Sequence, residues 1–174
     1  MKREHRLYNI ILPIWLLILF PEIWLILLPG NLIVDCLVLF LTLLALKHQG
    51  KGRVMKKLWW KFWLLGFAAD AVGVAWMFLG LLPAWIAGSG QVGELPAIVA
   101  AWEDSVGHIT HSAFAHPAAF AWTLIGVALA GACIYFFDKK AMGRCELLTP
   151  REKHIIALTM AVITAPWLFF IPMY

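Results

Sequence analysis

Three acidic residues, Glu22, Asp35 and Asp70, lie inside apolar stretches of the sequence that are long enough to cross a lipid bilayer. A carboxylate at membrane depth is costly, so it marks an ion or proton pathway by default. No Lys or Arg occurs at the same depth. The carboxyl groups must therefore be protonated, bonded to neutral groups, hydrated in a cavity or paired with a cation. These three residues predict a cation or proton site reached from outside.

A structural interpretation of the same residues stays open. Glu22 and Asp35 could lie in the headgroup region of the bilayer, where a carboxylate costs little. Asp70 could instead form a hydrogen bond across a helix interface and hold two helices together. Asn31 precedes Asp35 by four residues and therefore lies on the same helical face, although Asn is also a common residue at a helix start.

A second group of residues suits a metal ion. Between positions 96 and 116 the apolar residues recur at helical spacing, which predicts an amphipathic helix on the outer surface. On that helix Asp104, His108 and His111 follow an i, i+4, i+7 pattern and form one stripe. Such a stripe could bind a divalent transition metal such as zinc, with His116 or Glu103 completing the site. The alternative is a polar face in contact with water, and Gly107 weakens the helix.

The composition of the chain indicates a membrane protein. Of the 174 residues 63% are hydrophobic, against roughly 45–50% in soluble domains. A soluble chain of this length could not bury that excess, so apolar side chains must face lipid. The net charge of +4 comes from basic residues at the ends of apolar stretches, which indicates the anionic membrane surface and argues against nucleic acid.

All fourteen Lys and Arg residues fall in three clusters, within residues 2–6, 47–61 and 139–153. Basic residues in short loops stay on the cytoplasmic side. The clusters predict an all-α polytopic membrane protein, a single domain over residues 1–174, with the N-terminus in the cytoplasm and the C-terminus outside. We expect five transmembrane helices, at residues 7–28, 31–46, 58–86, 118–137 and 154–172.

Two local patterns refine this topology. Pro29-Gly30 predicts a tight outer turn that joins the first two spans in a hairpin and puts Glu22 and Asp35 at similar depth. The pairs Ala69-x-x-x-Gly73 and Gly126-x-x-x-Ala130 give the third and fourth spans small faces that could meet.

These observations favour a small channel or transporter for a cation or proton in the plasma membrane of the cell. One alternative is a membrane subunit without catalytic activity that assembles with or regulates a partner membrane protein. Another is a membrane-embedded metal-dependent enzyme, although the sequence contains no familiar catalytic motif and an enzyme is the weaker interpretation. So small a bundle has little interior of its own, so we expect a homo-oligomer or a partner membrane subunit.

Overall fold

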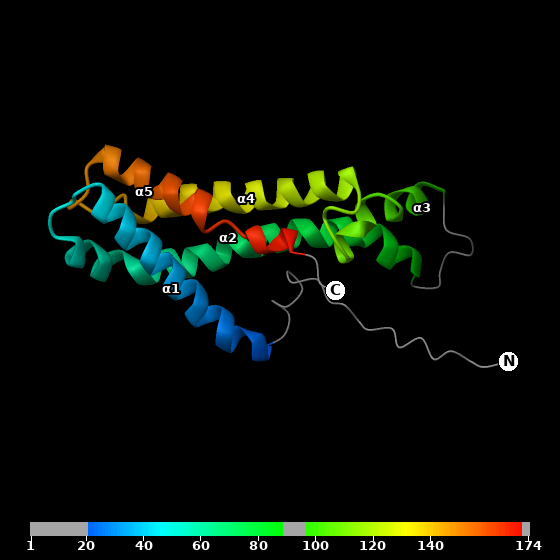
Figure 1. Ribbon diagram of the computed structural model, residues 1–174, viewed down its shortest axis with the longest axis horizontal. Coiled ribbons are helices and arrows are strands. Elements are labelled where there is room, and N and C mark those ends of the chain that lie inside the picture. Colours follow the sequence, from blue (N-terminus) through cyan, green and yellow to red (C-terminus); the bar gives the residue numbers. More distant parts are fainter. Residues whose placement is uncertain (1–20, 89–96, 172–174) are drawn as a thin grey trace.

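The protein is described by a computed structural model for residues 21–88 and 97–171. Within these ranges the chain is helical and contains no strand (Figure 1). Four of the helices are long and apolar enough to cross a membrane, over Leu25–Ala45, Lys51–Pro83, Pro117–Ala141 and Pro150–Phe170. The elements are α1 (Pro21–Ala45), α2 (Lys51–Gly88), α3 (Ala97–Glu103), the 3-10 helix η2 (Val106–Thr110), α4 (Pro117–Ala141), α5 (Pro150–Ile163) and the 3-10 helix η3 (Trp167–Phe170).

Helix α1 overturns the predicted turn at Pro29-Gly30, because the helix continues through both residues. Proline is tolerated inside a membrane helix when neighbouring groups compensate for its missing N–H. The carbonyl oxygen that Pro29 leaves without its helical donor is that of Leu25. Separately, the indole Nε1 of Trp63 donates to the carbonyl oxygen of Leu28 at 2.9 Å and ties this part of α1 to α2. The predicted outer hairpin is therefore wrong for the described residues, while positions 7–20 of the first expected span lie outside them.

This continuous helix also changes the relation between Glu22 and Asp35. The two residues are thirteen positions apart on α1, which corresponds to about 20 Å along the helix axis. They therefore do not share one depth, contrary to the expectation from the hairpin. The side chain of Glu22 lies outside the described residues, so it is not placed here.

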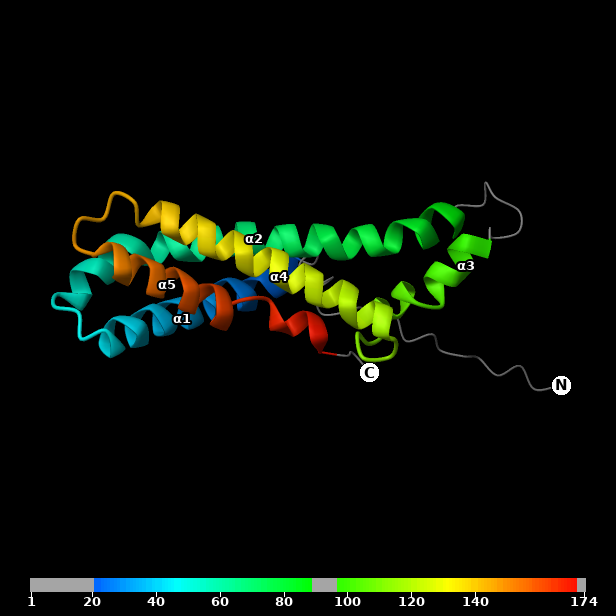
Figure 2. The ribbon, with the colours of Figure 1, turned by 90° about the horizontal axis from the view of Figure 1, so that it is seen from above.

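Helices α2 and α4 run side by side in opposite directions along the long axis of the molecule (Figures 1 and 2). Their small residues allow the close approach that the sequence predicts. A Cβ atom on Gly73 would lie 3.2 Å from the Cβ of Ala130 and 3.3 Å from the carbonyl oxygen of Gly126. Trp76 of α2 and Trp122 of α4 stack at 4.4 Å between ring centroids, and each indole donates to the other residue's carbonyl.

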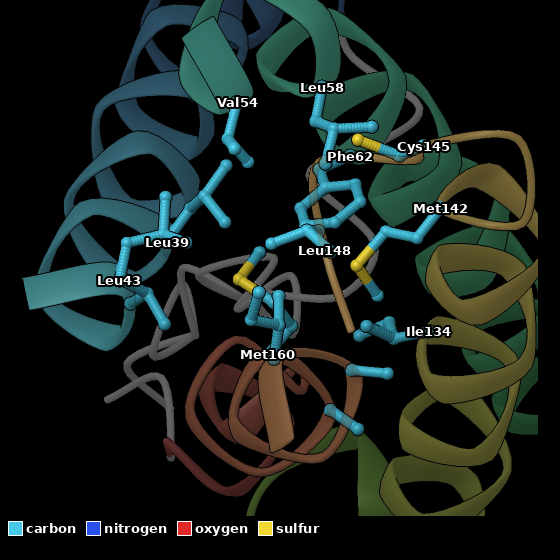
Figure 3. Close-up of a cluster of buried hydrophobic side chains, with 14 of the residues drawn as sticks. Leu39, Leu43, Val54, Leu58, Phe62, Ile134, Met142, Cys145, Leu148 and Met160 are labelled. Carbon is cyan, nitrogen blue, oxygen red and sulfur yellow. The ribbon is translucent and has the colours of Figure 1, made fainter. Parts of the chain in front are cut away.

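The main hydrophobic core lies between α1, α2, α4 and α5, near the end of the bundle that carries the basic residues. It is formed by fully buried aliphatic, aromatic and sulfur-containing side chains such as Leu39, Leu58, Phe62, Met142 and Met160 (Figure 3). Helix α5 packs against both α4 and α1. This core holds the basic ends of all four long helices together.

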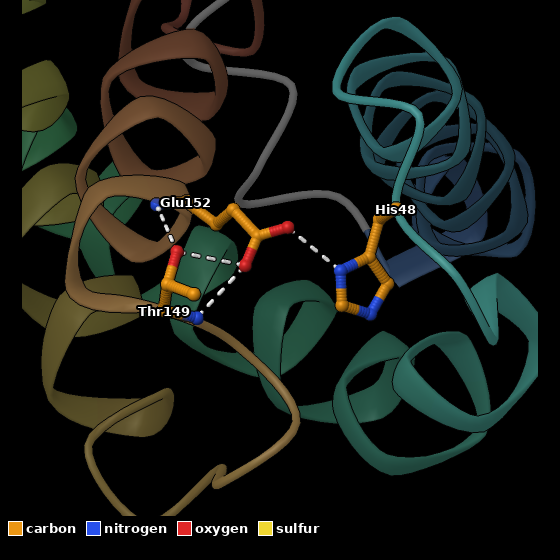
Figure 4. A network of polar contacts seen from close by, with 3 residues as sticks. All are labelled: His48, Thr149 and Glu152. Carbon is orange, nitrogen blue, oxygen red and sulfur yellow. Dashed lines mark hydrogen bonds and ion pairs between the residues drawn. The ribbon is translucent and has the colours of Figure 1, made fainter.

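A polar network closes the basic end of the bundle (Figure 4). Thr149 caps the start of α5 in a reciprocal capping box with Glu152. The other carboxylate oxygen of Glu152 lies 2.7 Å from Nδ1 of His48, in the turn between α1 and α2. The network therefore connects the start of α5 to the α1–α2 turn.

The segment between α2 and α4 differs from the single amphipathic helix predicted over residues 96–116. Helix α3 ends at Glu103, and the chain then forms the short 3-10 helix η2. The hydroxyl of Ser105 donates to the carbonyl oxygens of Ala101 and Trp102, a local bond that competes with helix continuation. The indole of Trp102 donates to the carbonyl oxygen of Gly80 at 2.8 Å and fixes this segment on α2.

Candidate functional site

A cavity of about 350 Å³ lies between α1, α2 and the segment that follows α5. Its polar lining consists of Asn31 and Asp35 from α1, Asp70 from α2 and Thr164 after α5. No Lys or Arg is among the described residues that line it. The cavity therefore combines two carboxyl groups with neutral polar groups inside the membrane-spanning part of the chain.

Asp35 is directed into the bundle by the helical periodicity of α1. The buried residues of this helix are Asp35, Val38, Leu39, Thr42 and Leu43, which alternate at spacings of three and one. Asp35 is thus on the inward face, and only 7% of its surface is exposed. A Cβ atom on Gly66 would lie 3.5 Å from Oδ2 of Asp35, so the missing side chain of Gly66 lets this carboxyl group approach α2.

Asp70 follows Gly66 by one helical turn on α2 and lines the same cavity. Its Oδ1 atom is buried and has no hydrogen-bond partner within the described part of the chain. Asp35 is close enough to interact electrostatically with Asp70. Two carboxylates that share a site repel each other unless a proton or a cation lies between them. The arrangement therefore has the chemistry of a cation or proton site.

The third wall of the cavity is an interrupted helix. Pro166 has no N–H to donate to the carbonyl oxygen of Val162, and α5 ends at Ile163. The indole Nε1 of Trp167 donates to that carbonyl at 2.8 Å instead. The backbone N–H and the hydroxyl of Thr164 both donate to the carbonyl oxygen of Met160. Irregular backbone at membrane depth is tolerated where it lines a cavity, and interrupted helices are a recurring way to build ion sites in transporters.

Asp138 is a third buried carboxyl group, and the sequence reasoning missed it. Only 1% of its surface is exposed, and neither carboxylate oxygen has a hydrogen-bond partner among the described residues. Residue 138 directly follows the span predicted at residues 118–137 and directly precedes Lys139 and Lys140, which predicts a cytoplasmic loop at this position. The available signal was its spacing of four from Ile134, which continues the buried face of α4.

The other predicted site residues, Asp104, His108 and His111, do not lie on one α-helix as the sequence predicted, because α3 ends at Glu103 and the 3-10 helix η2 follows. The ring of His108 stacks on that of His116 at 6.0 Å, and Nδ1 of His116 accepts the N–H of Ala118 as the cap of α4. Within the described residues no group of three His, Cys, Asp or Glu side chains is placed to share a metal ion. The helical spacing that motivated a zinc site is therefore not observed, while zinc binding itself stays a prediction.

Comparison of the chain with known protein families, with characterised proteins and with solved structures gave no significant match.

Proposed function

We propose that this protein is a small integral membrane channel or transporter that moves a cation or a proton, with Asp35 and Asp70 as the binding groups. The observation that carries this proposal is the cavity, which two carboxyl groups line beside an interrupted helix and to which the described residues contribute no basic side chain. A cation or proton stabilises such a pair because it removes their mutual repulsion. Asn31 and Thr164 would supply neutral oxygen ligands beside them.

Asp138 extends the site towards the basic end of the bundle. Because α2 and α4 are antiparallel and Gly73 meets Gly126 and Ala130, Asp138 lies level with about residue 63 of α2. Asp35 lies beside Gly66, and Asp70 follows Gly66 by four residues. The three carboxyl groups thus form a row, with a rise along the helix axis of about 4.5–6 Å between successive members. We place this row on the inner half of the pathway.

The basic end faces the cytoplasm in this proposal, by the distribution of Lys and Arg. Cations would then approach from outside past Glu103 and Asp104, whose charge would raise their local concentration. The expected five spans, the cytoplasmic N-terminus, the outer C-terminus and the plasma membrane location belong to this proposal. Assembly into a homo-oligomer also belongs to this proposal. The four long helices enclose little interior and leave many apolar side chains exposed, which a second copy of the chain could cover.

The test is ion flux in liposomes that contain only this chain. Purified protein is reconstituted, and proton and monovalent cation fluxes are measured against empty liposomes at matched lipid composition. The proposal predicts flux of at least one ion above the empty control, reduced in Asp35→Asn. The control Glu146→Gln removes an exposed carboxylate outside the cavity and should leave flux unchanged.

A second candidate function, a subunit that assembles with a partner membrane protein, is favoured by the unpartnered Oδ1 of Asp70. A Lys or Arg from a partner helix could enter the cavity and pair with Asp35 and Asp70. This alternative predicts no flux from the chain alone, together with stable co-purification of the partner. Asp70→Asn should then weaken the complex, because the interhelical ion pair is lost.

A further inference from the structure

A second pocket of about 430 Å³ lies between α2 and α4 at the basic end of the bundle, and the proposed ion pathway does not use it. Its walls include Trp60, Lys61, Leu64 and Leu65 from α2 and Phe137 and Lys140 from α4. None of the described residues that line it is acidic. The pocket therefore has a positive charge of two and a mainly aliphatic and aromatic surface.

The polar and apolar parts of this pocket are ordered along the membrane normal. Helix α2 starts at the basic end, so Leu64 and Leu65 are about one turn deeper in the membrane than Lys61. Helix α4 ends at the basic end, so Phe137 is likewise about one turn deeper than Lys140. Both ammonium groups thus belong to the cytoplasmic rim, and the apolar side chains belong to the floor.

The pocket also faces the lipid rather than the helix core. Trp60 is 46% exposed and Leu64 is 56% exposed, although both line the cavity. Nζ of Lys61 lies 5.7 Å from the ring centroid of Trp60, which is a typical arrangement for aromatic and basic groups at the headgroup level. A ligand could therefore enter sideways from the inner leaflet.

We propose that this pocket between α2 and α4 binds an anionic phospholipid, with the headgroup phosphate between Lys61 and Lys140 and an acyl chain against Leu64, Leu65 and Phe137. Basic pockets between membrane helices on the cytoplasmic side suit anionic headgroups. The order of charged rim and apolar floor matches the orientation of an inner-leaflet lipid. A soluble anion would use the two lysines but leave the apolar floor exposed to water.

The experiment is native mass spectrometry of delipidated protein in detergent, titrated with phosphatidylglycerol or with phosphatidylcholine of the same acyl chains. The variant Lys61→Gln/Lys140→Gln removes both rim charges. The matched control Lys56→Gln/Lys139→Gln removes the same charge from exposed positions of the same helices that do not line the pocket. Size-exclusion profiles establish that all three proteins are folded.

We expect one phosphatidylglycerol per chain to bind at least tenfold more tightly than phosphatidylcholine, because each lysine contributes on the order of a fivefold preference. The pocket variant should lose this preference, and the control variant should keep it. Equal affinity for the two lipids, or equal loss in both variants, would overturn the proposal. Competition by glycerol phosphate without acyl chains at similar concentration would also overturn it, since the site would then recognise a soluble anion.

Discussion

Replacing Asp138 should separate stability from function in this protein. Both carboxylate oxygens of Asp138 are buried and have no hydrogen-bond partner within the described residues. A buried polar group left unsatisfied costs about 1–3 kcal/mol. Leucine has a similar size and no polar atoms, so Asp138→Leu should stabilise the protein by about that amount. For a chain of this length, that corresponds to an increase in Tm of roughly 2–12 °C.

The Asn variant provides the second comparison. Asp138→Asn keeps the shape and the polarity but removes the ionisable group, so its Tm should stay close to that of the wild type. If Asp138 belongs to the row with Asp35 and Asp70, both variants should lose most of the ion flux. The assay is thermal unfolding in detergent, followed by flux in liposomes at equal protein content. A lower Tm for Asp138→Leu would show that the carboxyl group has a stabilising partner, and unchanged flux in Asp138→Asn would remove it from the pathway.

Three further predictions address packing, orientation and metal binding. Gly73→Ala should lower stability by about 1–3 kcal/mol in thermal unfolding, because the new Cβ atom would lie 2.9 Å from a ring carbon of Phe169. Gly30→Ala should be neutral or stabilising in the same assay, because nothing lies within 4 Å of its new Cβ atom. Equal effects of the two substitutions would contradict the packing argument. In a cysteine-free variant, a membrane-impermeant thiol reagent added to sealed, right-side-out vesicles should label Ala115→Cys and miss Gln49→Cys. The reverse pattern would invert the proposed orientation. Metal analysis of the purified protein should give less zinc for His108→Ala/His111→Ala than for the wild type if the outer segment binds metal, and equal content would dismiss the metal-dependent enzyme.

The charge distribution and the apolar composition were sufficient to predict an all-helical chain with several spans. The contact of the small residues around Gly73 and Ala130 was predictable too, because their spacing repeats on one helical face. The predicted turn at Pro29-Gly30 was wrong because α1 continues through both residues. Local sequence favours a turn there, but proline and glycine are tolerated inside membrane helices. The hydrogen bond from Trp63 to the carbonyl oxygen of Leu28, which ties this part of α1 to α2, cannot be identified from the local pattern.

Burial was the property that sequence reasoning estimated least well. Asp138 precedes two lysines and was assigned to a loop, although α4 continues to Ala141 and buries it. Cys145, in the loop after α4, is also only 1% exposed within the core. The outer segment was predicted as one helix because its apolar spacing is helical. The local hydrogen bonds of Ser105 compete with that helix. The bond from Trp102 to Gly80 holds the segment on α2, a contact that spacing does not encode.

The most direct test of the proposed ion site is the flux of Asp70→Asn measured beside Asp70→Leu. Asn keeps the size and the hydrogen-bonding capacity of Asp70 but cannot ionise, so the proposal predicts a normal size-exclusion profile with flux reduced to the level of empty liposomes. Asp70→Leu removes the polar carboxyl group, whose Oδ1 has no hydrogen-bond partner within the described residues, as well as the charge. Its flux should be equally low, whether or not assembly changes. Wild-type flux in Asp70→Asn would contradict the ion-site role of Asp70 and favour the assembly subunit.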